Sequence, residues 1–407
     1  MEVRPVTTRA EAAAFTRLPA RLGGEAAGWS VPLELDTRRF FDPGFNGVLR
    51  DHAVARFLAW RDGRAVGRIA AARRHAEPQG GMASFGFLAL EQDPAVLAAL
   101  LRAAGGWAAA QGAGRVRGPL SLTINHEVGA LVAGFGRAPM VRMPRTPDWL
   151  PAMLEGAGLA PEKEVVACTL ALAEERHRAR FAPLLARWPG SADLVIRPLD
   201  MRRFAAEIRL VTALYNDAWA GNWGAVPVGM AEAATIARIM RPLMHGGAIL
   251  VAEWQGEPMG VLSMIPNLEE ATAGLGGRLL PFGWWRVARV ALLGRSRTAR
   301  VPMLGIRRRF RGHPASAMAV GALLARAIDI AEARGWEDLE ISWILDDNAA
   351  MLQTMARLPA PVTGRWRLYG APLRQEEGSA RIRQEGGSAR PRQDGRPARL
   401  RHDGAPL

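Results

Sequence analysis

The chain has 407 residues, of which 49% are hydrophobic and 23% are charged, as expected for a globular protein with room for two domains. No apolar run reaches the roughly 18–20 residues of a membrane-spanning helix, and the N-terminal segment MEVRPVTTRAEAAAF lacks the apolar core of a signal peptide. The single cysteine, Cys168, excludes an intramolecular disulfide and a cysteine metal cluster, so we expect a reducing, cytoplasmic location.

The net charge of +14 comes almost entirely from arginine, because Lys163 is the single lysine. Together with heavy use of alanine and glycine, this bias is more typical of genome composition than of a basic nucleic-acid-binding face. The sequence has no helix-turn-helix, zinc-finger or aromatic RNA-binding signature. We therefore expect no nucleic-acid partner. The seven histidines lack the spacing of metal ligands, so we also expect no metal.

The first half begins with a predicted β-hairpin, in which two short apolar runs flank the turn pair Asp62-Gly63. A strand at 84–90, an Ala/Leu-rich helix, a glycine turn and a strand at 115–125 follow. The second half repeats this order, with a hairpin around Gly256, a strand at 301–306, a helix, a glycine turn and a strand at 337–348. The repeat predicts two copies of one fold, in domains at 1–175 and 191–372.

The two copies differ at the turn between the third strand and the helix. Gly86 and Asn125 are 39 residues apart, whereas the matching Gly305 and Asn348 are 43 apart. The four extra residues fall in RRRFRGHPAS, where the first half has only EQDPA. Successive backbone N–H groups at a helix N-terminus bind anions, and arginines beside this turn add positive charge.

The second-half turn resembles the acetyl-coenzyme A motif of the GNAT acetyltransferase superfamily. The motif falls on 309–314, after a strand and before a helix, and the following strand ends at Asn348. The segments PNL, GRLLPFGW and SWIL also resemble an uncharacterised subfamily of tandem GNAT proteins, over most of residues 1–370. The resemblance implies a mixed α/β fold of two GNAT-like domains. Each would have a mainly antiparallel sheet, a splayed central strand pair and flanking helices.

The resemblance also implies where acyl-coenzyme A binds. The loop amides would hold the pyrophosphate, and the pantetheine arm would pair with the backbone of the splayed strand, for which Gly305 is the candidate bulge residue. The implied acyl-CoA-binding residues are Leu304, Gly305, Ile306, Arg311, Gly312, His313, Ala315, Ser316, Ala317 and Asn348. Two positions depart from the family pattern: Pro314 removes one N–H donor, and Met355 stands where many members carry a tyrosine acid.

The corresponding turn of the first half predicts no acyl-CoA site. Asp93 and Pro94 are a good N-cap and first helical residue, so the side chain of Asp93 would satisfy the amides that a phosphate needs. Glu91 and Asp93 would also repel a pyrophosphate. We therefore expect the first half to be a degenerate copy that shapes the substrate groove.

The acceptor pocket is expected near 214–224, which concentrates aromatic and amide side chains just before the second hairpin. The candidate substrate-contacting residues are Tyr215, Asn216, Trp219, Asn222 and Trp223, although core packing explains this composition equally well. The candidate catalytic residues are Tyr215, Glu253 and Asp347. His126 and Glu127, after the last matched strand of the first half, form a weaker candidate pair, for which a cap or surface role is the simpler reading.

Two further segments have a distinctive composition. Residues 278–295 are rich in tryptophan, leucine and arginine, and are expected to cover a groove between the halves, with contact to a membrane surface as the alternative. Residues 373–407 form a degenerate repeat of arginine, glycine, proline and acidic residues, and are expected to be disordered because they contain almost no large apolar side chain.

These features predict an acyl-CoA-dependent N-acyltransferase that transfers an acetyl group to the amine of a small molecule or peptide, with acyl-CoA held by the second half only. The alternative from another class is a non-catalytic acyl-CoA-binding or interaction protein that keeps the fold.

Overall fold

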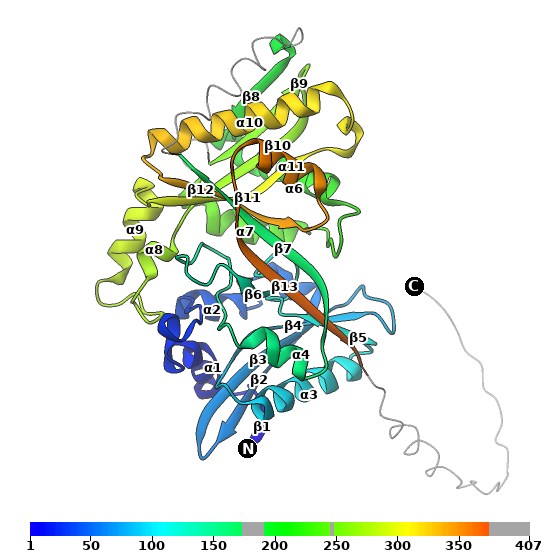
Figure 1. Cartoon of the computed structure of the whole chain (residues 1–407), viewed down its shortest axis with the longest axis vertical. Helices are drawn as coiled ribbons and strands as arrows, with labels where there is room; N and C mark the ends of the chain where they lie inside the picture. The colour runs from blue at the N-terminus through cyan, green and yellow to red at the C-terminus, as the bar shows by residue number, and fades with distance from the viewer. Residues whose placement is uncertain (173–190, 245–247, 374–407) are drawn as a thin grey trace, which may run out of the picture. The chain divides into compact units, whose positions relative to one another are not determined.

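The computed structural model describes residues 1–172, 191–244 and 248–373. These residues belong to one compact unit that ends at Leu373. The domain boundary expected between 175 and 191 and the tail expected to be disordered fall largely outside the described residues. The fold is the mixed α/β architecture that the sequence predicted, but the strands form one large sheet instead of a separate sheet in each domain (Figure 1).

The first half follows the predicted order of elements. Its hairpin is formed by β2 and β3, its third strand is β4, and the helix after them is α3. The next strand, β5, is shorter than the strand expected at 115–125. It ends at Gly118, because Pro119 has no N–H to donate to a sheet ladder. The elements are β1 Glu2–Pro5, α1 Arg9–Arg21, α2 Glu34–Phe40, β2 His52–Arg61, β3 Arg64–Arg74, β4 Met82–Leu90, α3 Pro94–Ala110, β5 Arg115–Gly118, β6 Ala130–Ala133, α4 Leu150–Gly156 and β7 Ala160–Ala171.

The second half repeats the design with β9 and β10 as the hairpin, β11 as the third strand and α10 as the helix. The helix α10 packs on β8, β9, β10 and β11, as α3 packs on β2, β3 and β4 (Figure 1). The elements are β8 Leu194–Pro198, α6 Phe204–Trp219, α7 Met230–Met240, β9 Ile249–Trp254, β10 Glu257–Pro266, α8 Glu269–Thr272, α9 Gly283–Leu293, β11 Thr298–Ile306, α10 Pro314–Ala333, β12 Asp338–Leu345, α11 Ala349–Arg357 and β13 Val362–Pro372.

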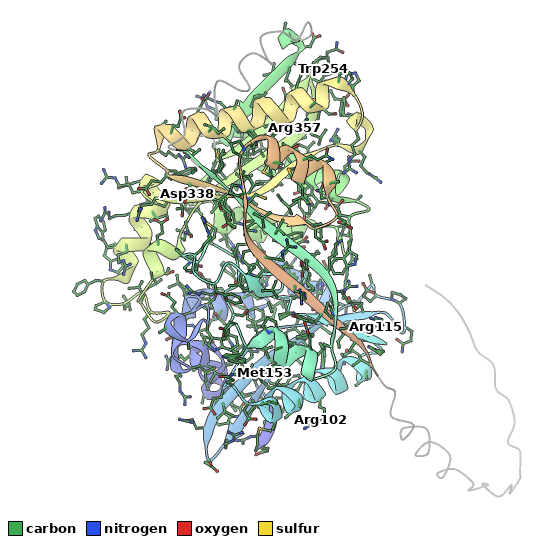
Figure 2. The ribbon with its side chains drawn as sticks, viewed as in Figure 1. Arg102, Arg115, Met153, Trp254, Asp338 and Arg357 are labelled. Carbon is green, nitrogen blue, oxygen red and sulfur yellow. The ribbon has the colours of Figure 1, made fainter. Side chains whose placement is uncertain are left out.

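The halves exchange their last strands. The strand order is β1-β2-β3-β4-β5-β13-β7-β12-β11-β10-β9-β8, so β13 from the end of the chain pairs with β5, and β7 from the first half pairs with β12. Figure 2 shows Arg115, at the start of β5, beside the end of β13. The exchange makes one sheet of two similar halves and brings the ends of β5 and β12 to the middle of the molecule.

Each half has its own apolar core. Leu323, Leu324 and Ile328 of α10 are buried against the second half of the sheet, and Val96, Leu97 and Leu100 of α3 are buried against the first. By length and composition α10 is the one helix of the described ranges that could cross a membrane, but 56% of its most apolar window is buried inside the protein. We therefore interpret α10 as a core helix.

Candidate active site

The second half of the sheet opens between β11 and β12. These two strands pair in parallel from Thr298–Asp338 to Val301–Ile341, and the ladder then ends. On its other side β11 continues to pair with β10, with a register shift between Arg300 and Met303. The resemblance noted in the sequence implies that the pantetheine arm of acyl-coenzyme A would pair with the strand edge at this opening.

The β-bulge that the sequence predicted at Gly305 lies elsewhere on β11. Gly305 pairs regularly with Val261, and the irregularity lies around Pro302, which lacks the N–H that a regular ladder requires. The reason for a glycine at 305 is space, because a Cβ there would lie 2.6 Å from Cη2 of Trp219. The glycine therefore lets an aromatic ring lie directly on the open strand.

A buried arginine holds the opening in place. The guanidinium of Arg300, which is 4% exposed, donates from Nε to the hydroxyl of Ser342 at 2.9 Å and from an Nη atom to the carbonyl of Val141 at 3.0 Å. Burial lowers the pKa of Arg300 to about 10, so it stays protonated at neutral pH. The side chain thus ties β11 to β12 at the point of divergence and ties both to the first half.

A small, shallow aromatic pocket that is open to solvent lies next to the opening. The rings of Tyr215 and Trp219 stack at 4.6 Å between centroids on the C-terminal part of α6, and the guanidinium of Arg117 lies 4.1 Å above the ring of Trp223. Four of the five predicted substrate-contacting residues meet here with residues of β12 and the first half. The lining residues are Ile124, Tyr215, Trp219, Asn222, Trp223, Ala225, Trp343 and Leu345.

A chain of polar groups leads from the pocket into the interior. The hydroxyl of Tyr215 donates to Oδ1 of Asn125 at 2.8 Å, and Nδ2 of Asn125 donates to Oε1 of Glu232 at 3.5 Å. Nε2 of His126 lies 4.0 Å from the same Glu232 oxygen, while Nδ1 of His126 lies 2.9 Å from the Thr123 hydroxyl. We call Tyr215, Asn125, Glu232 and His126 the polar cluster.

The electrostatics of the polar cluster follow from its burial. Burial raises the pKa of the Glu232 carboxyl to about 7, against a usual 4.5, and the carboxylate of Asp51 acts in the same direction. Burial lowers the pKa of His126 to about 3, so its imidazole is neutral and makes no ion pair with Glu232 near neutral pH. Burial also raises the pKa of Tyr215, whose phenol therefore stays protonated. Within this cluster, only Glu232 exchanges a proton near neutral pH.

The predicted phosphate loop forms the N-terminus of α10. Gly312 has a φ of +82° and faces open space, and the ring of His313 caps the helix by accepting from the N–H of Ala315 at 3.1 Å. The Ser316 hydroxyl donates to the carbonyl of Phe310, and the Arg311 side chain donates to the carbonyl of Ala218. Trp254 of β9 lies beside this helix end, with its ring 5.9 Å from that of His313 (Figure 2).

The first half has neither an open loop before its helix nor a free strand edge beside β4 in the described residues. Asp93 caps α3 through the N–H of Ala95 at 2.8 Å, as the sequence predicted, and also accepts from Arg61. The chain after β5 runs along the open edge of β4, where the N–H of Leu120 donates to the carbonyl of Phe85 at 2.7 Å. A Cβ at Gly86 would collide with the carbonyl of Leu120. The space that is open beside β11 is therefore filled by the protein's own backbone beside β4.

Several predicted site residues lie elsewhere or are occupied. Glu253 accepts from Arg197 at 2.8 Å on the sheet, and Asp347 is ion-paired to Lys163 at 2.6 Å with its side chain 65% exposed. Asn216 exchanges hydrogen bonds with the backbone of Val228, and so braces a loop instead of lining the pocket. Asn348 caps α11 through the N–H of Met351, and Met355 is packed in the second-half core. The described residues contain no cluster of potential metal ligands.

Sequence reasoning missed Glu232 altogether and used Asn125 only as a marker of strand length. His126, expected in a cap or surface pair with Glu127, instead faces Glu232, while Glu127 accepts from the Ser121 hydroxyl at 3.1 Å. One signal was available for Glu232: a single carboxylate stands in the otherwise apolar first turn of MAEAATIARIM. An ionisable residue on a buried helix face is a recognised mark of a functional site.

Comparison with solved structures defines the class of protein. A tandem GNAT protein from the clavulanic acid biosynthesis pathway has a TM-score of 0.54 at 15% identity, covering 92% of this chain and 99% of that one. A glucosamine N-acetyltransferase region of a fungal multi-domain β-N-acetylglucosaminidase also has a TM-score of 0.54, at 14% identity, covering 91% of this chain and 38% of that one. The chain therefore has the tandem GNAT fold.

Comparison with curated proteins defines the family. The bacterial ceramide synthase of Caulobacter vibrioides is 34% identical over 374 residues, which cover 91% of this chain and 97% of the relative. Protein YghO of Escherichia coli is 31% identical over 373 residues, covering 90% and 94%. No protein-family model matches. The chain belongs to the family that contains the bacterial ceramide synthase.

Proposed function

We propose that this protein is an acyl-CoA-dependent N-acyltransferase that joins a fatty acyl group to the amine of a long-chain base, producing a ceramide-type amide. The observation that carries the proposal is the aromatic pocket at the opening of β11 and β12, with Tyr215 connecting it to Asn125 and Glu232. Kinship with a ceramide synthase supports a long-chain acceptor and a fatty acyl donor in place of the acetyl group expected from the sequence.

The residues present fit acyl-CoA in the second half. Gly312 leaves the turn before α10 open to a pyrophosphate, and Arg307 and Arg311 add positive charge beside it, while Arg308 and Arg309 are ion-paired with Asp217 and Glu257. The open edge of β11 would take the pantetheine arm, which places the thioester beside the pocket. In the first half a carboxylate, that of Asp93, caps the helix, and the backbone near Leu120 fills the equivalent strand edge, which supports a single donor site per chain.

The polar cluster orients the amine for acyl transfer. The amine nitrogen attacks the thioester carbonyl, the carbon–sulfur bond breaks, and one proton moves in net terms from nitrogen to sulfur. Nδ2 of Asn125 donates to the carbonyl of Val226 at 3.2 Å and to Oε1 of Glu232 at 3.5 Å, and Oδ1 of Asn125 accepts from Tyr215. Ionisation of Glu232 strengthens its hydrogen bond with Asn125, which holds the amide and the phenol more firmly. The phenol oxygen then presents its lone pairs to an amine N–H in the pocket, which orients the nucleophile. Glu232 is thus a positioning residue, and Tyr215 contacts the substrate.

A cytoplasmic location, as expected from the sequence, remains part of the proposal. Cys168 is buried in the second-half core as a free thiol, and burial raises its pKa to about 11, so it is chemically inert. A free structural cysteine and a CoA thioester donor both suit a reducing cytoplasm.

The direct test is to incubate the purified protein with palmitoyl-CoA and a saturated long-chain base, and to follow amide by mass spectrometry and thiol release by a chromogenic reagent. We expect amide and free coenzyme A in equal amounts, and less product from acetyl-CoA. Calorimetric titration with palmitoyl-CoA should show one site per chain. Binding of one acyl-CoA without turnover on any amine would refute the proposal in favour of a non-catalytic acyl-CoA-binding protein.

A further inference from the structure

The segment 278–295 carries an unusual concentration of exposed apolar side chains. Six of the twelve exposed large hydrophobic residues in the described part of the chain lie within 280–293. We call them the α9 face: Leu280 (80% exposed), Phe282 (80%), Trp284 (50%), Trp285 (58%), Leu292 (66%) and Leu293 (61%). These six side chains point to solvent, so the outer side of the segment covers no other part of the described residues.

The helix beneath this face is firmly seated. Its inner side is buried at Gly283 and Val290, it packs on α8, and Gly294 ends it in the left-handed conformation with its N–H on the carbonyl of Val290. The helix is therefore apolar on both its inner and outer sides. A cluster of large apolar side chains that is exposed on a folded protein normally marks a binding surface, and none of the described residues covers the outer side of α9.

The charges around the α9 face identify the partner. Arg289 and Arg295 are exposed, and Arg286 donates only to the carbonyl oxygen of Glu270, so its positive charge is not neutralised there. Between Glu270 and Asp329 the sequence contains no acidic residue. Tryptophan and leucine flanked by arginine suit the boundary between lipid headgroups and acyl chains, where the rings and chains enter the apolar layer and the guanidinium groups reach lipid phosphates.

We propose that the α9 face binds the surface of a membrane that contains anionic lipid. A second copy of this chain is a poorer occupant, because a two-fold interface through this face would bring two sets of arginines of the same charge together. The basic rim instead complements an anionic surface, where each arginine strengthens binding. The inference rests on exposure and charge alone, and holds whatever reaction the pocket performs.

The test is co-sedimentation of the full chain with sucrose-loaded vesicles of phosphatidylcholine, with or without about one third phosphatidylglycerol. We expect binding to the anionic vesicles that weakens with added salt. The double variant Trp285→Gln, Leu292→Gln should lower the partition coefficient at least about tenfold, and Arg289→Gln about fivefold. The matched control is Ile236→Gln, Ile239→Gln, which removes two exposed apolar side chains of α7, each 40% exposed, and should leave binding unchanged.

Each variant is checked for folding by its melting temperature, and all should remain folded because the altered side chains are exposed. Equal sedimentation of the wild type and the α9 double variant would overturn the proposal. The proposal would also be overturned if the wild type failed to bind vesicles and instead formed an oligomer, measured by light scattering, that dissociates in the α9 double variant. That result would assign the face to a contact between copies of the chain.

Discussion

Replacing Glu232 with glutamine separates the proton chemistry of the polar cluster from its structural role. The folded-state pKa of about 7 lies above the usual 4.5, so the folded protein binds this proton more tightly than the unfolded chain. Glu232 therefore favours folding most at low pH, and this contribution declines as the pH rises from about 4.5 through about 7. The full difference corresponds to roughly 3 kcal/mol of unfolding free energy.

Glu232→Gln removes that pH dependence, because glutamine cannot ionise. At about pH 8 the variant should be more stable than the wild type by up to roughly 3 kcal/mol, and at about pH 4.5 nearly equal, as measured by urea unfolding. Glutamine can still accept from Asn125, so the variant should keep part of its activity. The rise of kcat/KM with a midpoint near pH 7, which we expect for the wild type, should be absent.

Glu269→Gln is the matched control. Burial also raises the pKa of Glu269 to about 7, but its side-chain hydrogen bond goes to Thr272, outside the polar cluster. This variant should gain stability at high pH by the same mechanism and keep the pH profile of the wild-type activity. An unchanged profile in Glu232→Gln, or the same loss of profile in both variants, would contradict the role given to Glu232.

Four further results are expected. Gly312→Asp should abolish the binding of palmitoyl-CoA measured by calorimetry. Gly312→Asn should keep most of it, because asparagine has the same shape as aspartate without the charge and also tolerates a positive φ. Equal affinities of the two variants would exclude this loop as the pyrophosphate site. Asp93→Ala should cost about 1 kcal/mol of stability in urea unfolding through loss of the α3 cap, with no effect on acyl-CoA affinity. Gly305→Ala should displace Trp219 and raise KM for the long-chain base more than it lowers stability, which a comparison of steady-state kinetics with melting temperature would reveal. Tyr215→Phe should lower kcat about a hundredfold while the protein stays folded, and a value near wild type would remove the phenol from the mechanism.

The local features of this fold could be predicted because neighbouring residues determine them. Asp62-Gly63 forms the hairpin turn between β2 and β3 since both residues adopt a positive φ, and Asp93 with Pro94 starts α3 as expected of a cap and first residue. The repeated order of hairpin, strand, helix and strand also appears in both halves of the structure. The four extra residues of the second-half turn correspond to a longer loop, in which Gly312 faces open space and the ring of His313 caps the helix, whereas the carboxylate of Asp93 caps the helix after the shorter first-half turn.

The site itself depends on contacts between distant residues. Tyr215 and Asn125 are separated by 90 positions, and Asn125 and Glu232 by 107, so no local pattern connects them. Strand exchange brings them together: β13 pairs with β5 and β7 pairs with β12, and this pairing sets the end of the first half beside the pocket of the second.

Periodicity, turn residues and caps were thus readable from the sequence alone, because each expresses the conformational preference of a few adjacent residues. The tertiary structure alone decided which carboxylates titrate near neutral pH, which open strand edge stays free and which apolar helix face stays uncovered. Those properties depend on burial, and the burial of a side chain is set by the parts of the chain that pack against it, however far away in sequence they lie.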